Sequence, residues 1–181
     1  MNIIDAPLSG LIILETKLFS DLRGYFYEGY QQTRYSDLGM PPFVQDNMSR
    51  SKQNVLRGLH YQLPHAQGKL VGVTRGKVWD VVVDIRKTSP TFGKWFSIVL
   101  SDENHLQMYI PPGFAHGFCV LSPEADFYYK CTDFYTPASE RGIIWNDPRL
   151  NIEWPITNPI LSPKDEIYSP LHEIPHDQLF A

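Results

Sequence analysis

The stretch RGLHYQLPHAQGKLVGVTRGKVWDVVVDIR (residues 57–86) decides the fold of this 181-residue chain. It lies among seven short runs that are rich in β-branched and aromatic residues and are separated by turn-forming residues. The runs cover residues 55–62, 69–75, 77–86, 94–100, 107–110, 117–121 and 127–133. Runs of this length and composition predict β-strands, and their even spacing predicts a sandwich or barrel.

Helix signals are few. Residues 31–39 (QQTRYSDLG) predict one short helix that Gly39 ends, and SDEN at 101–104 predicts a single capped turn. No repeat or linker divides the sequence, so we expect one β domain over residues 1–181. The proline-rich tail from Trp154 onward is predicted to wrap this domain and then to fray.

The composition is that of an ordinary globular protein, with 43% hydrophobic residues, 20% charged residues and a formal net charge of -4. This balance disfavours a nucleic-acid partner. The sequence has no glycine-rich phosphate loop, so a small phosphate would be held by arginines, with Arg23 and Arg57 as candidates.

The apolar run LIIL (11–14) is too short for a signal peptide or a membrane span, so we expect a cytoplasmic protein without a membrane partner. Cys119 and Cys131 lie in apolar runs and have no zinc-binding spacing. We expect both thiols to be reduced and buried.

A further pattern is the frame of a cupin metal site, whose ligands come as HxH, then a glutamate, then a histidine after PxG. His60 opens the first element (HYQ), and PPGFAH at 111–116 supplies the last. Gln62 stands at the position of the second histidine of this pattern, and Lys69 stands at the position of its glutamate. Because an ammonium group at a ligand position repels a cation, we expect no metal, and a metal-dependent cupin oxygenase is disfavoured.

Lys69 is suited to a different task, which is to stabilise negative charge on a carbonyl oxygen in a pocket with little water. A nearby base would remove a proton next to that carbonyl, and His60 has the right pKa for it. Inversion also needs an acid on the opposite face of the carbon. The run FYYKCTDFY offers Tyr129, but the sequence alone does not choose it over Tyr128 or Tyr135.

Other polar residues are expected to have structural roles or none. Asp80 shares a strand face with Val78 and Val82, so its carboxylate needs a cationic or hydrogen-bonding partner. Arg86 is expected to pair with a strand carboxylate. We assign no function to His65, His105, His172 and His176, which lie in polar or tail segments.

Nine segments, in order and over nearly the whole chain, resemble the dTDP-4-dehydrorhamnose 3,5-epimerases (RmlC family). They are FSDLRGYFYE (19–28), FVQDNMSRS (43–51), VLRGLHYQ (55–62), QGKLV (67–71), VWDVVVDIRKTSPTFGKW (78–95), IPPGFAHGFCVL (110–121), YYKCTDFY (128–135), RGIIWNDP (141–148) and LSPKD (161–165). Any one segment alone is a weak signal, whereas nine in register are specific.

The resemblance implies a metal-free, all-β, cupin-type double-stranded β-helix (jelly roll) with short peripheral helices. By position, His60 resembles the family base, Asp165 its carboxylate partner, Lys69 the residue at the enolate and Tyr129 the acid. These groups would invert C3 and C5 of dTDP-4-dehydro-6-deoxy-D-glucose without a cofactor, giving dTDP-4-dehydro-L-rhamnose for dTDP-L-rhamnose biosynthesis.

The resemblance also implies a substrate-binding set and a homodimer. Arg57 is similar to a residue on the pyrophosphate, and Tyr135 to an aromatic residue near the thymine. Residues similar to sugar-nucleotide contacts are Gln45, Asn47, Gln62, His116, Glu140 and Lys164. Residues similar to an arm that reaches the neighbouring subunit's site are Arg23, Phe26 and Glu28.

Two other functions stay open at this point. A single-centre epimerase, which inverts only C3 or only C5 of a related 4-keto deoxysugar nucleotide, would share His60 and Lys69. A non-catalytic sugar-nucleotide-binding cupin would be expected to lack His60, Lys69 or Tyr129.

Overall fold

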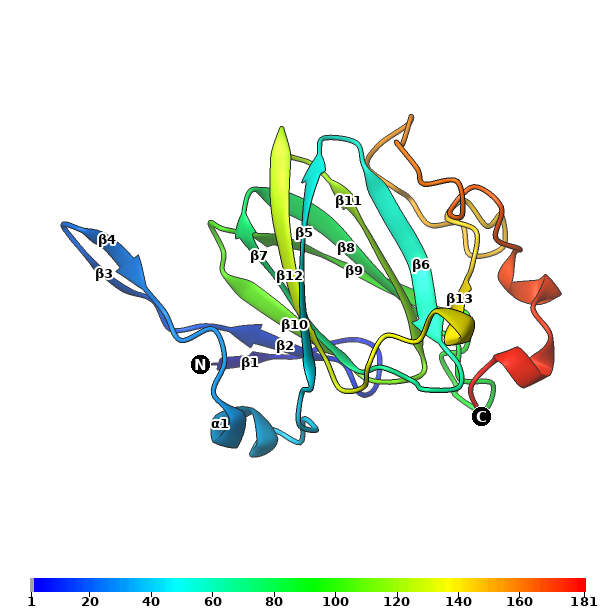
Figure 1. Ribbon diagram of the computed structural model, residues 1–181, viewed down its shortest axis with the longest axis horizontal. Helices are drawn as coiled ribbons and strands as arrows, with labels where there is room; N and C mark the ends of the chain where they lie inside the picture. Colours follow the sequence, from blue (N-terminus) through cyan, green and yellow to red (C-terminus); the bar gives the residue numbers. More distant parts are fainter. Residues whose placement is uncertain (1) are drawn as a thin grey trace.

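Two antiparallel β-sheets face each other in the computed structural model, which describes residues 2–181 (Figure 1). The six-stranded sheet has the order β1 (Asn2–Ile4), β2 (Ile12–Glu15), β10 (Leu106–Ile110), β7 (Lys69–Arg75), β12 (Glu124–Cys131) and β5 (Gln45–Lys52). The five-stranded sheet has the order β13 (Glu140–Gly142), β6 (Leu56–Gln62), β11 (Phe114–Val120), β8 (Lys77–Asp84) and β9 (Trp95–Ser101). Within residues 2–181 no strand pairing joins the two sheets, so the barrel is a pair of facing sheets.

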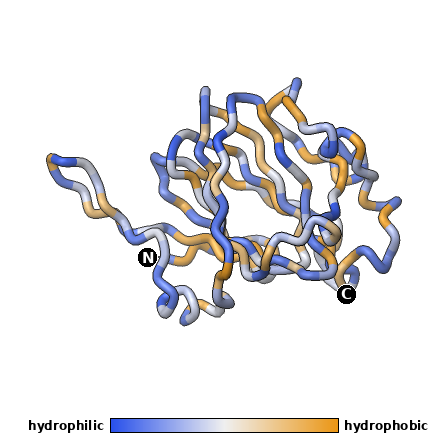
Figure 2. The backbone as a smooth tube through the Cα atoms, in the orientation of Figure 1, coloured by the Kyte–Doolittle hydropathy of each residue, from blue (hydrophilic) through white to orange (hydrophobic). Residues whose placement is uncertain are grey.

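The main core lies between the sheets because alternate residues of each strand point inward. Val71 and Phe127 from one sheet pack with Val82 and Phe118 from the other. The rings of Phe118 and Phe127 are stacked with their centroids 4.2 Å apart. Figure 2 shows the hydrophobic stretches running along the strands. Burying one such side chain stabilises the fold by about 2 kcal/mol.

The all-β jelly roll with short peripheral helices is confirmed, and each predicted strand corresponds to an observed one within a few residues. The helix predicted at 31–39 is shorter in the structure, where α1 covers Gln32–Ser36. Gly39 adopts the left-handed conformation (φ +86°) that favours glycine after a helix. Among the described residues, no helix has the length and apolar character to span a membrane.

The tail contradicts one expectation, because it does not fray after wrapping the sheet. It contains the 3₁₀ helices η2 (Leu171–Glu173) and η3 (His176–Gln178), and a third, η1 (Pro137–Ser139), precedes β13. Leu171, Ile174 and Leu179 are buried against the outer side of the five-stranded sheet. Apolar residues near the chain end thus form a second core together with the outer side of this sheet.

The sequence patterns did not single out the hairpin of β3 (Phe19–Asp21) and β4 (Gly24–Phe26) as strands. It projects away from the sheets (Figure 1), and most of its side chains are exposed.

The cysteines Cys119 and Cys131 are unpaired and buried, as expected. Arg86 pairs with Asp84 at 2.7 Å, which confirms the expected structural ion pair.

Candidate active site

A cavity of about 360 Å³ opens between the two sheets. The six-stranded sheet contributes wall residues from β5, β7 and β12, and the five-stranded sheet contributes them from β6, β11 and β13. The lining residues are Gln45, Asn47, Ser49, Arg57, His60, Tyr61, Gln62, Gln67, Lys69, His116, Phe118, Phe127, Tyr129, Tyr135, Glu140, Ser162, Lys164 and Asp165. All four predicted catalytic residues are among them.

His60 on β6 forms a histidine–carboxylate pair with Asp165, whose Oδ1 lies 2.5 Å from the imidazole Nε2. Ser162 donates a 2.8 Å hydrogen bond to the other carboxylate oxygen of Asp165. Burial lowers the pKa of His60 from its ordinary value, and this effect exceeds the opposing effect of Asp165. The ring is therefore neutral at neutral pH, as a general base must be.

Asp165 is buried, yet it remains ionised. Burial alone would raise its pKa, but the hydrogen bonds from His60 and Ser162 together hold the pKa of Asp165 below its usual value. A carboxylate with both oxygens engaged fixes the orientation of the imidazole it contacts.

Lys69 begins β7 on the opposite sheet and lines the same cavity as His60. Its Nζ lies 6.0 Å from the ring centroid of Tyr129. Within residues 2–181 this ammonium group has no hydrogen bond or ion pair, and burial lowers the pKa of Lys69. An unpaired donor in such a place stabilises a negative charge that develops on a bound molecule.

The three candidate acids occupy different places. Tyr129 on β12 points between the sheets, and burial raises the pKa of its phenol. Tyr128 points to the opposite face of the same sheet, where its hydroxyl meets Asp46 and Lys130. Tyr135 lies half exposed at the rim. Only Tyr129 of the three faces the interior of the cavity beside Lys69.

Asp80 has the partner that its position on β8 required. Both of its carboxylate oxygens lie close to Nε2 of His116, at 2.9 and 3.0 Å. The His116 ring also stacks on Phe127, with ring centroids 6.0 Å apart and nearly parallel planes. His116 is therefore held rigidly in the cavity wall.

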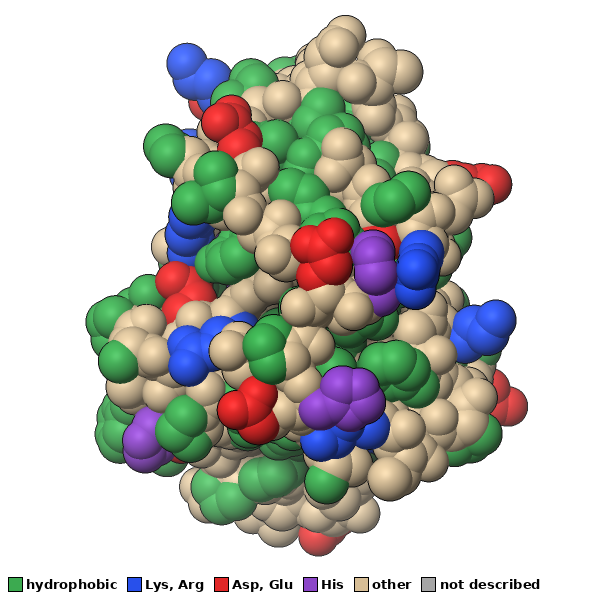
Figure 3. Space-filling model, turned by 90° about the vertical axis from the view of Figure 1, so that its right-hand side faces the viewer, with side chains coloured by type: hydrophobic (Ala, Val, Ile, Leu, Met, Phe, Trp, Pro, Cys, Tyr) green, Lys and Arg blue, Asp and Glu red, His purple; other side chains and the backbone are tan. Residues whose placement is uncertain are grey.

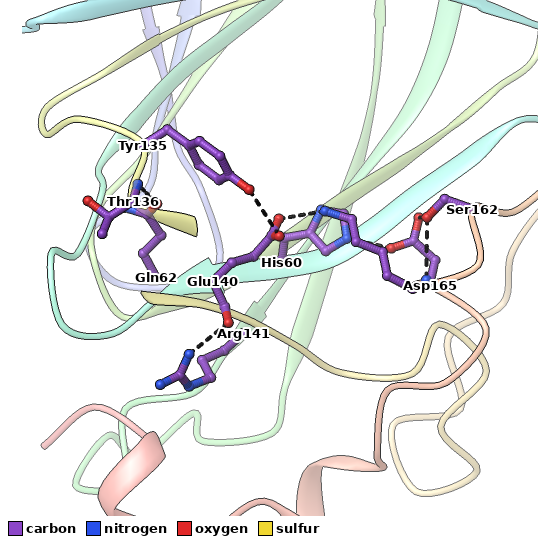
Figure 4. A network of polar contacts seen from close by, with 9 residues as sticks. His60, Gln62, Tyr135, Thr136, Glu140, Arg141, Ser162 and Asp165 are labelled. Carbon is purple, nitrogen blue, oxygen red and sulfur yellow. Dashed lines mark hydrogen bonds and ion pairs between the residues drawn. The ribbon is translucent and has the colours of Figure 1, made fainter. Parts of the chain in front are cut away.

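A polar network forms one side of the cavity. Glu140 accepts hydrogen bonds from the Tyr135 hydroxyl (3.2 Å) and from Lys164 Nζ (2.6 Å). Figure 4 shows Tyr135 reaching Glu140 on one side of His60, and Ser162 reaching Asp165 on the other. Burial would raise the pKa of Glu140, but its hydrogen bonds hold it below the usual value. Glu140 is thus an anion at this wall.

Gln62 lines the cavity, but its amide serves the protein itself. Its Nε2 donates to the carbonyl groups of His65 and Phe134, and its Oε1 accepts from the Thr136 amide. The position of a metal ligand in the cupin frame is therefore used to brace two loops. Among residues 2–181, no group of three or more His, Cys, Asp or Glu side chains is arranged to hold a metal ion.

The predicted binding residues divide into two groups. Gln45, Asn47, Arg57, Gln62, His116, Tyr135, Glu140 and Lys164 line the cavity. Arg23 and Phe26 lie on the projecting hairpin, and Glu28 lies just after it, so none of these three lines the cavity of its own chain. Arg23 pairs with Asp21, and Glu28 pairs with Arg34.

Sequence reasoning missed several wall residues, of which Ser162 is the most informative. Its hydroxyl meets both the backbone amide and the carboxylate of Asp165. The spacing S-x-x-D in SPKD is a local hydrogen-bonding motif that would have revealed it. The other wall residues that the sequence did not single out are Ser49, Tyr61, Gln67, Phe118 and Phe127.

The face of the molecule in Figure 3 carries hydrophobic side chains interspersed with acidic, basic and histidine side chains. Charges of both signs lie close together there. This face therefore has no uniform field that would attract a polyanion.

The family model described as dTDP-4-dehydrorhamnose 3,5-epimerase matches residues 5–173. A protein of that name from Shigella flexneri is 56% identical over 168 residues, which cover 91% of this chain and 93% of the relative. One from Escherichia coli K12 is 52% identical over 185 residues, and the match covers all of both chains. The crystal structure of a dTDP-6-deoxy-D-glucose-3,5-epimerase from Legionella pneumophila, in complex with dTDP-4-keto-L-rhamnose, has a TM-score of 0.96 and 53% identity, covering 99% of this chain and 97% of that one.

Proposed function

The chain belongs to the dTDP-4-dehydrorhamnose 3,5-epimerase family and is an isomerase, and we propose that the cavity between its sheets inverts C3 and C5 of dTDP-4-dehydro-6-deoxy-D-glucose. The product of this reaction is dTDP-4-dehydro-L-rhamnose, an intermediate of dTDP-L-rhamnose biosynthesis. Both carbons lie next to the C4 carbonyl, so both protons become acidic when the carbonyl oxygen is stabilised.

One observation carries the proposal. His60 comes from the five-stranded sheet, whereas Lys69 and Tyr129 come from the six-stranded sheet on the other side of the cavity. A sugar ring between the sheets would then meet a base on one face and an acid on the other. Inversion of a carbon requires this arrangement, because the new proton must arrive opposite the one removed.

The proposed steps balance without an added reagent. Neutral His60 takes the proton from the carbon next to the carbonyl, and the electron pair of that bond moves to form an enolate. Lys69 stabilises the negative charge on the enolate oxygen. Tyr129 then gives its phenolic proton to the carbon from the opposite face, and proton exchange with solvent restores both side chains. Asp165 stays ionised and stabilises the imidazolium in between.

We propose that this reaction needs no metal or other cofactor, because Lys69 supplies the positive charge that a metal supplies in related barrels. Protein dialysed against a chelator should keep its full turnover. Loss of turnover that zinc or iron restores would contradict the role proposed for Lys69.

We also propose that the chain acts as a homodimer and as one domain over residues 1–181. The arm with Arg23, Phe26 and Glu28 would complete the cavity of the neighbouring subunit. Its exposed aromatic side chains support this, since Phe19, Tyr25 and Phe26 are each more than half exposed in the single chain. A cytoplasmic location is part of the same proposal, and the free buried thiols of Cys119 and Cys131 agree with a reducing compartment.

The test is the reaction in deuterated water with dTDP-4-dehydro-6-deoxy-D-glucose as substrate. We expect deuterium at both C3 and C5 of the product, detected by NMR. Label at one carbon only would replace the double epimerase with a single-centre one. Label at neither carbon, with the nucleotide still bound, would leave a binding protein. The His60→Ala variant serves as the control that binds without exchange.

A further inference from the structure

The projecting hairpin rests on an aromatic stack at its base. Tyr25 on β4 packs on the ring of His105 with 4.8 Å between ring centroids, and Tyr27 packs on the same ring at 5.2 Å. The two tyrosine rings lie 6.1 Å apart and are stacked on each other. His105 belongs to the turn between β9 and β10, so this stack joins the arm to the main body of the fold.

The outer part of the hairpin has little else to hold it. The hairpin's other aromatic contact, between Phe19 and Phe26 at its base, is internal, and its ion pair joins Arg23 to Asp21 near the tip. Leu22 at the tip is fully exposed. A hairpin with three paired positions has marginal stability alone, so its direction depends on what holds its base.

His105 is a fixed platform for this purpose. It is only 7% exposed, and its backbone amide donates a 3.0 Å hydrogen bond to the Ser101 carbonyl. Its own carbonyl accepts a 3.0 Å hydrogen bond from the Thr16 hydroxyl. Thr16 directly follows β2, where the chain leaves the sheet to form the arm. His105 is thus fixed within its own turn and bonded to the segment from which the arm departs.

Two properties of His105 are unfavourable for a residue that only fills space. Its backbone is left-handed (φ +50°), a conformation that glycine or asparagine adopts more readily. Its Nδ1 atom is buried and has no hydrogen-bond partner among the described residues, which a purely apolar side chain would avoid. The contacts of its ring with Tyr25 and Tyr27 offset these two unfavourable properties.

We propose that His105 is a positioning residue for the arm, and that its ring sets the direction in which the hairpin leaves the body. Without the ring, the hairpin would sample more directions, and the arm would reach the neighbouring cavity in a smaller fraction of molecules. Substrate would then bind more weakly, while the reacting groups inside the cavity would be unchanged. This inference rests on the proposed role of the arm in a homodimer.

The experiment compares two substitutions of His105 in the full-length enzyme. His105→Asn removes the ring but tolerates the left-handed backbone, whereas His105→Phe keeps an aromatic surface. We expect His105→Asn to raise KM for dTDP-4-dehydro-6-deoxy-D-glucose by about three- to tenfold. We expect its kcat to stay within about twofold. Backbone hydrogen exchange over residues 18–27 should become faster in His105→Asn, and His105→Phe should restore both values.

Arg23→Ala separates this inference from the proposed function. If Arg23→Ala raises KM and His105→Asn does not, the arm has its proposed role but His105 does not position it. If neither changes KM, the proposed role of the arm fails, and faster exchange over residues 18–27 in His105→Asn still supports the platform. Unchanged exchange in His105→Asn would overturn it. An equal loss of kcat and thermal stability in both His105 variants would also overturn it, because that result indicates a general structural role.

Discussion

His60 and His116 lie directly opposite each other on the adjacent strands β6 and β11, and each ring meets a buried aspartate through Nε2. The two pairs differ in access. The His60 side chain is 21% exposed, whereas that of His116 is 9% exposed and is stacked on Phe127. The same pairing therefore gives one ring that is more open to the cavity and one ring that is held within the wall.

The acid limb of the pH profile should lie below pH 6.5, the ordinary pKa of histidine. Burial lowers the pKa of His60, and a base must be unprotonated to act. Activity is therefore kept at neutral pH and lost only as the pH falls through the lowered pKa. A plot of kcat/KM against pH for deuterium exchange measures this limb directly. A limb above pH 6.5 would contradict a base in a desolvated site.

Asp165→Asn should move this limb to still lower pH and slow the reaction. The Asp165 carboxylate raises the pKa of His60, so its removal lowers that pKa further. The amide would also disturb the orientation of the imidazole, with a loss in kcat of roughly a hundredfold or more. Ser162→Ala, which removes the hydrogen bonds of this hydroxyl with the carboxylate and the backbone amide of Asp165, should cause a loss of about tenfold or less. An Asp165→Asn enzyme with the wild-type profile would refute the pairing.

Tyr129→Phe should keep exchange at the carbon next to the carbonyl but impair inversion. In the proposed mechanism proton removal and proton delivery use different groups, so loss of the phenol should affect only the second step. The measurement compares deuterium uptake in recovered substrate with product formation. Tyr128→Phe is a matched control, because Tyr128 directly precedes Tyr129 on β12 and points to the opposite face. Full turnover by Tyr129→Phe would remove the acid assignment.

Lys69→Gln should reduce kcat by about a hundred- to a thousandfold, because in the proposed mechanism the enolate oxygen would lose its charged donor. The effect on KM should be small, since the charge develops only during the reaction. Lys77→Gln serves as a control, because Lys77 makes an exposed ion pair with Glu103. A rise in KM with unchanged kcat would mean that Lys69 binds substrate and does not stabilise the enolate.

The strand pattern followed from local signals in the sequence, whereas most of the cavity residues were implied by the family resemblance. Periodic apolar runs predicted the core strands, and the departures at Gln62 and Lys69 indicated a site without metal ligands. The sequence showed that the Asp80 carboxylate needs a partner, but it did not identify this partner as His116. The two residues are 36 positions apart, and only the register of the sheet brings them together. The same limit applies to His105, whose partners Tyr25 and Tyr27 lie far away in the chain. Long-range contacts of this kind carry no periodic signal.

Asp84→Asn should destabilise the fold strongly at neutral pH and little near pH 2. Asp84 is buried and accepts hydrogen bonds from Arg86, Ser89 and Thr91. Burial would raise its pKa, but these bonds lower the pKa of Asp84 to about 2 from 3.8. A depressed pKa stabilises the folded state above the unfolded value, and this contribution of about 2 kcal/mol is lost as the pH falls toward 2.

The free energy of unfolding in urea, measured at one protein concentration, tests this expectation. Wild type and Asp84→Asn should differ by at least about 2 kcal/mol at pH 7 and converge in acid, because the wild-type carboxylate is then protonated as well. Glu103→Gln is a suitable control, since the Glu103 side chain is 77% exposed and its ion pair is open to solvent. A difference between wild type and Asp84→Asn that stays constant from neutral to acid pH would show that the cluster acts through packing and not through the charge of Asp84.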